Sequence, residues 1–188
     1  RIVREYTREA GVRGLEREVA RICRKVARRV VSNGPETHIR VTSRNLSRLL
    51  GVPPFTDPRV EEEDAVGVVQ GLAVSAVGGL VLDIEVAVVP GSGRLILTGG
   101  LGETLRESAQ AGLSYIRSRA DQLGLERGFH TRVDVHVHYP GHSANADGPS
   151  AGAAMVTAMT SALTDIPVRS DVAVTGEISL RGRVLPVG

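Results

Sequence analysis

The first 54 residues carry apolar side chains at the spacing of an amphipathic helix. The clearest series is separated by alternating steps of four and three residues: Leu15, Val19, Ile22, Val26 and Val30. Residues 32–35 follow and contain Gly34 and Pro35, two residue types that end helices. Residues 1–10 have the pattern of the end of a preceding helix, and Thr42 or Ser43 is placed to cap a third helix ending at Leu50. The pattern predicts a small helical subdomain over residues 1–54.

From residue 66 onward the apolar pattern changes to a period of two, which is typical of strands. Strands are predicted over Val66–Val77, Leu80–Val89, Arg94–Thr98, Val133–His138 and Val172–Thr175. Gly78-Gly79 is placed to form a hairpin turn. Helices are predicted over Glu103–Leu123 and in the run of small residues that follows Ser150. Strands and helices in this order predict a mixed α+β domain over residues 66–188.

Residues 55–65 separate the two predicted domains. They contain Pro58 and the acidic run Glu61–Asp64, a composition that favours a linker.

Composition adds few constraints. The balance of 41% apolar and 23% charged residues is that of a globular protein with a sizeable core. Cys23 is the sole cysteine, so no internal disulfide is possible, and its place on the apolar stripe of its helix predicts a core residue. The chain starts without a signal-peptide pattern, and its first residues are typical of the middle of a longer protein. No apolar run is long enough to span a bilayer, so no membrane association is expected.

Charge is distributed unevenly along the chain. Residues 1–50 hold 13 Arg or Lys against 5 Glu, a net charge of +8, whereas residues 51–188 hold 10 against 16, a net charge of −6. The basic helices make a nucleic-acid-binding module one hypothesis, although solvated helix faces explain most such clusters. Lys25, in this basic part, is the sole lysine.

The candidate chemistry lies in Asp147–Gly152, with the sequence Asp-Gly-Pro-Ser-Ala-Gly. Pro149 suits the first position of a helix, which places Ser150 in the first helical turn. Backbone N–H groups and the positive end of the helix dipole favour negative charge there, such as the oxyanion formed when a serine attacks a carbonyl. The small residues after Ser150 would let a polypeptide lie close to it. Serine is also a common helix cap, so a purely structural role is the alternative.

A nucleophilic serine requires a proton acceptor. His142 is near Ser150 in sequence, so a Ser–His hydrolase is one hypothesis. Lys25 is expected on the surface of the other domain, so it does not supply a lysine base. His136 and His138 share a strand face with Asp134, but no further ligands complete a metal-site pattern, and a polar strand face is the preferred interpretation.

Two stretches, Asp147–Met155 and Thr175–Gly188, closely resemble the proteolytic domain of the ATP-dependent Lon proteases. The residues Tyr6–Glu18 resemble the small helical subdomain of the Lon ATPase module. The resemblance covers essentially the whole chain, except that Gly141–Ala146 departs from the glutamate, proline and lysine typical of Lon. The resemblance therefore implies nothing about how that loop contacts substrate.

The resemblance implies the C-terminal part of a bacterial, cytoplasmic serine endopeptidase that degrades unfolded or damaged proteins through a Ser–Lys dyad. Ser150 matches the nucleophile, and the lysine follows the segment matching Val184–Gly188. The 188 residues alone are therefore expected to be inactive. Thr175 matches a threonine near that lysine, and Asp147 and Glu85 match acidic positions bordering the site.

For the intact protein, the resemblance implies a ring-shaped homohexamer that uses ATP and magnesium, bound mainly outside this chain. Arg13 matches an arginine that senses nucleotide phosphates in AAA+ ATPases. No Gly-rich phosphate loop ending in Gly-Lys-Ser/Thr is present in the sequence. A non-catalytic domain retained for assembly or partner binding is the further alternative.

Overall fold

The computed structural model describes residues 1–55, 63–75, 78–139 and 148–187. It divides into two compact units, residues 1–58 and residues 59–188.

The first unit consists of three helical elements joined by irregular segments. A π-helical turn, η1 (Val3–Thr7), precedes the long helix α1 (Arg13–Asn33) and the short helix α2 (Leu46–Leu50). Their buried side chains form one small core: Tyr6, Ile22, Leu46, Leu49 and Leu50. The predicted helical character is therefore confirmed for this unit.

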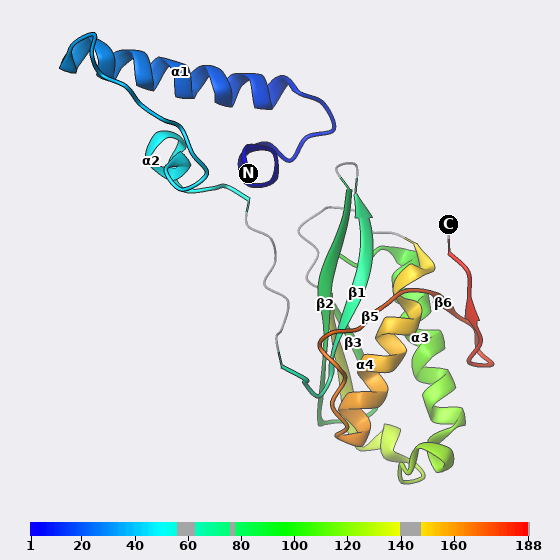
Figure 1. Ribbon diagram of the computed structural model, residues 1–188. Helices are drawn as coiled ribbons and strands as arrows, with labels where there is room; N and C mark the ends of the chain where they lie inside the picture. The colour runs from blue at the N-terminus through cyan, green and yellow to red at the C-terminus, as the bar shows by residue number, and fades with distance from the viewer. Residues whose placement is uncertain (56–62, 76–77, 140–147, 188) are drawn as a thin grey trace. The chain divides into compact units, whose positions relative to one another are not determined.

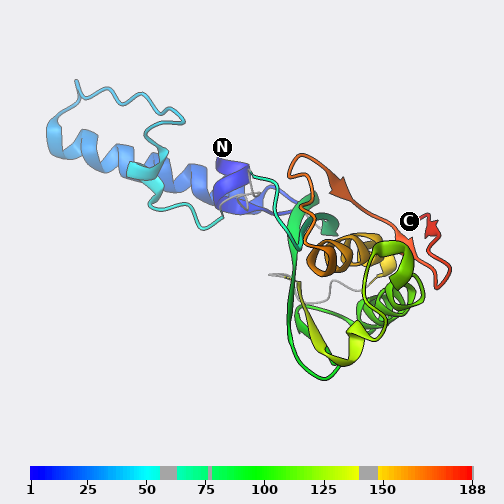
Figure 2. The ribbon, with the colours of Figure 1, turned by 90° about the horizontal axis from the view of Figure 1, so that it is seen from below.

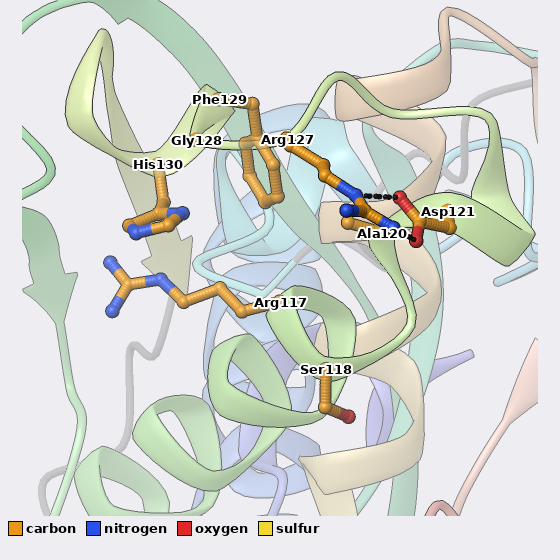
Figure 3. Close-up of a pocket in the computed structure, with 8 residues that line it drawn as sticks. All are labelled: Arg117, Ser118, Ala120, Asp121, Arg127, Gly128, Phe129 and His130. Atoms are coloured by element: carbon orange, nitrogen blue, oxygen red, sulfur yellow. Dashed lines mark hydrogen bonds and ion pairs between the residues drawn. The ribbon is translucent and has the colours of Figure 1, made fainter.

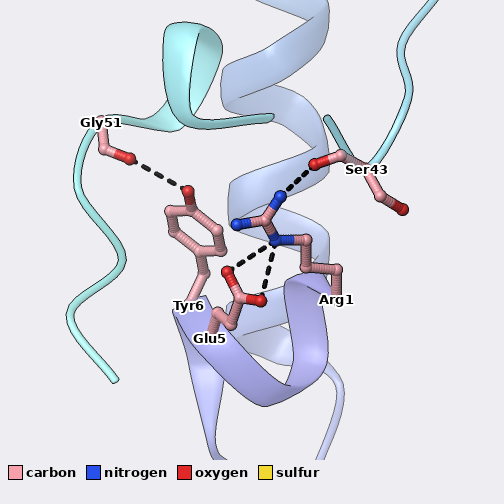
Figure 4. Close-up of polar contacts among 5 residues, drawn as sticks. All are labelled: Arg1, Glu5, Tyr6, Ser43 and Gly51. Carbon is pink, nitrogen blue, oxygen red and sulfur yellow. Dashed lines mark hydrogen bonds and ion pairs between the residues drawn. The ribbon is translucent and has the colours of Figure 1, made fainter. Parts of the chain in front are cut away.

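Side-chain bonds to backbone carbonyls connect separate segments of the first unit (Figure 4). The hydroxyl of Tyr6 donates to the carbonyl oxygen of Gly51 at 2.9 Å. The guanidinium of Arg1 contacts both carboxylate oxygens of Glu5 and the carbonyl oxygen of Ser43. These bonds hold η1 against the chain on both sides of α2, which supplements a core of only a few side chains.

Two sequence predictions for this unit are wrong. Neither Thr42 nor Ser43 caps α2, which begins after Asn45 instead. The Asn45 side chain accepts a hydrogen bond from the N–H of Thr42 and donates one to the carbonyl of Arg40, so it organises the preceding turn. Cys23 is exposed rather than buried. Because the few elements packed on α1 cover a narrow stripe, Ile22 is its one buried residue within the described chain.

The second unit is built on a five-stranded sheet with the strand order β3-β4-β2-β1-β5. Its strands are β1 (Val68–Ser75), β2 (Gly78–Pro90), β3 (Leu95–Gly99), β4 (Val133–Tyr139) and β5 (Ala173–Val174). Strand β2 pairs antiparallel with β1 and β4, while β3 pairs parallel with β4 and β5 parallel with β1. Of these five strands, only β2 therefore runs in the opposite direction to the others.

The predicted turn at Gly78-Gly79 is wrong. Gly78 already pairs with Ser75 and Gly79 with Val74, so both glycines belong to β2. The first position of β2 favours glycine because Gly78 has a φ of 128°, a value that residues with a side chain rarely adopt.

Two helices, α3 (Glu103–Ser118) and α4 (Gly152–Thr164), cover one face of the sheet (Figures 1 and 2). Residues Ile84, Val86, Val135 and Val137 point toward them and are buried, whereas Glu85 and His138, on the opposite face, are exposed. Helix α4 is apolar on nearly all sides and packs against both α3 and the sheet, with Ala154, Met155, Ala158 and Met159 completely buried. The alternation predicted for β2 is therefore confirmed from Leu82 to Val86.

The predicted helix over Glu103–Leu123 becomes two elements. Helix α3 ends at Ser118, and the 3₁₀ turn η2 (Ala120–Leu123) continues to Gly124, whose φ is 71°. The turn η3 (Phe129–Thr131) then leads into β4. After β5, the chain forms a small hairpin of β6 (Glu177–Ile178) and β7 (Val184–Leu185).

The two units together confirm the predicted α+β fold class, with a helical subdomain followed by a mixed α/β domain. Across the described residues, we find no helix with the length and apolar character needed to cross a membrane.

Candidate functional site

The serine stretch forms a tight turn at the start of α4. Pro149, Ser150 and Ala151 make the 3₁₀ turn η4, which continues directly into α4 at Gly152. Gly148 precedes the turn with a φ of 152°, which favours glycine, and the fixed φ of Pro149 suits the first helical position. Ser150 is partly exposed, whereas Ala151 behind it is buried. The structure therefore confirms that Ser150 lies in the first turn of a helical segment, as predicted.

The direction of the strands places this turn at a distinctive edge of the sheet. Strands β1, β3, β4 and β5 end at the same edge because they run parallel to one another. Helices α3 and α4 both begin at that edge (Figure 1). In sheets of this kind, the edge at the carboxyl ends of the strands is the usual place for ligands and catalytic groups.

Thr175, the residue after β5, lies against the serine turn. Its side-chain hydroxyl donates to the backbone carbonyl of Ser150 at 3.3 Å. The same carbonyl accepts the N–H of Gly176 at 2.8 Å, and the N–H of Ala153 donates to the carbonyl of Gly176 at 2.9 Å. Two of the predicted site residues, Ser150 and Thr175, are therefore brought together although they are 25 positions apart.

The structure places Glu85 on β2, beside the carboxyl end of β4. Glu85 is exposed on the face of β2 opposite to the buried Ile84 and Val86, and it pairs with Val68 and His138. Asp147, His142 and the unusual loop Gly141–Ala146 lie outside the described residues.

The two strand histidines bond to a threonine rather than to Asp134. The hydroxyl of Thr98 lies 2.8 Å from Nε2 of His136 and 2.9 Å from Nδ1 of His138. Asp134 is buried and accepts the N–H groups of Ser92, Gly93 and Arg94. Among the residues that the structure places, no three His, Cys, Asp or Glu side chains form a group able to hold a metal ion.

Asp134 serves the turn between β2 and β3. The N–H groups of Arg94 and Ser92, together with the Arg94 guanidinium, favour its charged form and lower its carboxyl pKa from 3.8 to about 2. The guanidinium contacts the second carboxylate oxygen at 2.8–2.9 Å. The buried carboxylate is therefore fully used in holding the turn and is not free to act as a ligand.

In the first unit, Arg13 is the first residue of α1 and is exposed. Lys25 is exposed on the same helix, as predicted.

A pocket lies at the carboxyl end of α3, away from the edge where α3 and α4 begin (Figure 1), and Figure 3 shows the residues that line it. It is formed by the last turn of α3, η2 and η3, and includes Arg117, Phe129 and His130. Figure 3 shows Arg127 directed at Asp121, with which it makes two hydrogen bonds of 3.1 and 2.8 Å. This pocket is separate from the serine turn because α3 and α4 run in the same direction from the edge that carries Ser150.

Sequence reasoning missed the two glycines that fit the serine turn to the segment after β5. An added Cβ at Gly152 would lie 3.0 Å from the backbone nitrogen of Ile178, and one at Gly176 would lie 2.5 Å from Cγ1 of Val184. The sequence does show a glycine directly after Thr175. Its partner, the serine turn, is identified only from the three-dimensional structure, in which β5 lies next to β1.

Comparison with known protein families matches both parts of the chain. The Lon protease (S16) C-terminal proteolytic domain matches residues 40–188, and the Lon protease AAA+ ATPase lid domain matches residues 1–39. The boundary between the two matched families falls between α1 and α2, whereas in the structure α2 packs in the core of the first unit.

Individual relatives show the same similarity. The chain is 54% identical over 187 residues to Lon protease 1 of Syntrophobacter fumaroxidans and to Lon protease 1 of Bacillus subtilis, and 55% identical over 188 residues to Lon protease of Heliobacterium modesticaldum. Each alignment covers 100% of this chain but only 23–24% of the relative. The chain therefore spans about a quarter of the length of these curated relatives.

The serine turn, its contact with Thr175 and these matches agree on one assignment. The chain belongs to the Lon protease family, of which it carries the AAA+ lid and the C-terminal proteolytic domain.

Proposed function

We propose that this chain supplies the peptide-cleaving part of an ATP-dependent serine endopeptidase that degrades unfolded or damaged proteins. The observation that carries the proposal is the position of Ser150, partly exposed in the turn that begins α4 and bonded through its backbone to Thr175 and Gly176. Membership of a protease family supplies the reaction class.

The proposed reaction is acyl transfer. Ser150 Oγ attacks the carbonyl carbon of the scissile peptide while a neutral lysine amine accepts the hydroxyl proton. The resulting oxyanion is stabilised by backbone N–H groups around Ser150. Collapse of this tetrahedral intermediate expels the amine of the leaving peptide, which takes up the proton. Water then attacks the acyl-enzyme, and a second collapse releases the new carboxyl group and restores the Ser150 hydroxyl.

The proposed lysine follows the segment matching Val184–Gly188 in the family. Residues 66–188 contain no lysine, and Lys25 is exposed on α1 of the other unit. We therefore expect these 188 residues alone to show no Ser150-dependent peptide cleavage. We propose that Thr175 acts as a supporting residue through the Ser150 carbonyl, and that Asp147 and Glu85 border the site as their matching positions in the family do.

For the intact protein, we propose the organisation that the family resemblance implies. Residues 1–54 act as the lid subdomain, 55–65 as a linker and 66–188 as the peptidase domain of a cytoplasmic, hexameric ring. Arg13 is exposed at the beginning of α1, where it can reach outward to the phosphates of ATP, with magnesium, bound mainly outside this chain.

DNA binding is a second candidate function for the first unit. Helix α1 exposes seven basic side chains: Arg13, Arg17, Arg21, Arg24, Lys25, Arg28 and Arg29. Phosphate contacts by such residues release counterions, so DNA affinity should fall steeply as the salt concentration rises. Absence of binding at low salt would remove this candidate.

A serine-directed probe tests the main proposal in the full-length protein. We expect a fluorophosphonate to form one covalent adduct, mapped to Ser150 by mass spectrometry of the digested protein. Full-length protein with wild-type activity and no adduct at Ser150 would contradict the proposal. Loss of activity on His142→Ala, with the fold retained, would instead favour the Ser–His alternative. A folded full-length protein with neither labelling nor proteolysis would favour a non-catalytic assembly role.

A further inference from the structure

The serine turn and the segment after β5 approach too closely for a side chain to lie between them. Gly152 is the first residue of α4, and an added Cβ there would lie 3.0 Å from the nitrogen and 3.2 Å from Cγ2 of Ile178. It would also lie 3.5 Å from the carbonyl oxygen of Gly176. The backbone of Gly176 is therefore within direct reach of the turn that carries Ser150.

Both backbone polar groups of Gly176 bond to that turn. Its N–H donates to the carbonyl of Ser150 at 2.8 Å, and its carbonyl accepts the N–H of Ala153 at 2.9 Å. These two bonds lie on either side of the step from η4 into α4. They attach both Ser150 and the first turn of α4 to the same residue, Gly176.

The backbone conformation at Gly176 requires glycine. Its φ is +148°, a value that L side chains rarely adopt. An added Cβ would lie 2.5 Å from Cγ1 of Val184 and 3.6 Å from Cβ of Ala153. A residue with a side chain would have to change its backbone angles or displace β7, and either change would disturb the pair of bonds to Ser150 and Ala153.

We propose that Gly176 is a positioning residue for the nucleophile, which it holds through the paired backbone bonds to Ser150 and Ala153. This inference rests on the proposed function of Ser150. The direction of the Ser150 Cα–Cβ bond follows from its backbone, so these bonds fix the position of Cβ, from which the staggered χ1 rotamers place Oγ. A displacement of about 1 Å at a reacting group costs on the order of 10²-fold in rate.

The test compares two glycine substitutions in the full-length protein. Gly176→Ala should lower kcat for a small peptide substrate by about tenfold or more, with KM within about twofold of wild type, because position rather than binding is disturbed. Labelling of Ser150 by a fluorophosphonate should slow by a similar factor. Gly124→Ala is the matched control: Gly124 also has a positive φ, of 71°, but an added Cβ meets nothing within 4 Å, so kcat and labelling should stay at wild-type values.

A second variant separates positioning from backbone strain. Gly152→Ala pushes on the same contact from the helix side, where φ is −57° and alanine is a better helix former than glycine. We expect it to reduce kcat and labelling in protein that still folds, because the gain in helix propensity offsets part of the cost of the tight contact with Ile178. It decides the question by itself if Gly176→Ala does not fold.

The outcomes separate this inference from the proposal on which it rests. If Ser150→Ala is inactive while Gly152→Ala and folded Gly176→Ala keep wild-type kcat and labelling, the positioning role is overturned and the nucleophile stands. If Ser150→Ala retains wild-type peptidase activity, the proposed function itself fails.

Discussion

The hydroxyl of Thr175 donates to the backbone carbonyl of Ser150, which joins the residue after β5 to the turn that begins α4. The distance is 3.3 Å, and the same carbonyl also accepts the N–H of Gly176. The side-chain bond therefore adds to the backbone bond from Gly176 in orienting Ser150.

Replacing this hydroxyl should reduce turnover moderately. Thr175→Val keeps the shape of the side chain but removes the donor, and a neutral hydrogen bond contributes about 0.5–1.5 kcal/mol. Because about 1.4 kcal/mol corresponds to a tenfold change in rate, we expect kcat of the full-length protein to fall by about two- to tenfold. The measurement is steady-state hydrolysis of a peptide substrate.

A control is available on α4 itself. The Thr157 hydroxyl bonds to the carbonyl of Ala153 at 2.8 Å, also between a threonine and the backbone of this segment. Thr157→Val should leave kcat within about twofold of wild type, since a neutral bond of about 0.5 kcal/mol that does not orient Ser150 has little effect on rate. An equal loss in both variants would show that the effect of Thr175 is general destabilisation.

Ser161 should be important for stability rather than turnover. Its buried hydroxyl accepts the N–H of Gly67 at 2.9 Å and donates to the carbonyl of Ile166. Ser161→Ala leaves both backbone groups without this partner, and we expect the free energy of unfolding to fall by about 1–3 kcal/mol in denaturant titrations. Thr164→Val, at a partly exposed position near the end of the same helix, should change it by less than about 1 kcal/mol.

Asp134 should make the second unit sensitive to acid. Its pKa is lowered to about 2 in the folded protein from an ordinary value of 3.8. The folded state therefore binds the proton less readily than the unfolded state, so the stabilisation is fully present above about pH 4 and is lost as the pH falls from 3.8 toward 2. Unfolding midpoints measured across this range should fall more steeply for wild type than for Asp134→Asn.

The Asn variant should also be less stable than wild type at neutral pH, because an amide loses the charge that pairs with Arg94 and the N–H groups of the turn. Asp121→Asn is the contrasting case. Its partner Arg127 is 85% exposed, so water already screens that pair, and we expect little change in the unfolding midpoint. An acid limb unchanged by Asp134→Asn would refute this account of the β2–β3 turn.

The periodic pattern of the sequence was sufficient for the main elements because burial follows it directly. Ile84 and Val86 alternate with exposed Glu85 on β2, and Leu105, Ala109, Leu113 and Ile116 form the buried stripe of α3. The location of Ser150 in the first turn before α4 was predictable for a local reason, since Gly-Pro-Ser determines the chain direction within three residues.

Features that depend on tertiary contacts were not predictable in the same way. Cys23 lies on the periodic stripe of α1 but is exposed, because the thin first unit provides no second layer to cover it. Gly176 has no periodic signal at all, since its importance lies in two backbone bonds to a segment more than twenty residues away.

The central claim, that Ser150 is the nucleophile, is tested most directly by Ser150→Ala in the full-length protein. The measurement is ATP-dependent degradation of an unfolded protein, followed together with ATP hydrolysis. We predict that degradation falls by about 10³-fold or more, as expected for removal of a nucleophile, while ATP hydrolysis continues. Degradation at the wild-type rate by this variant would contradict the account.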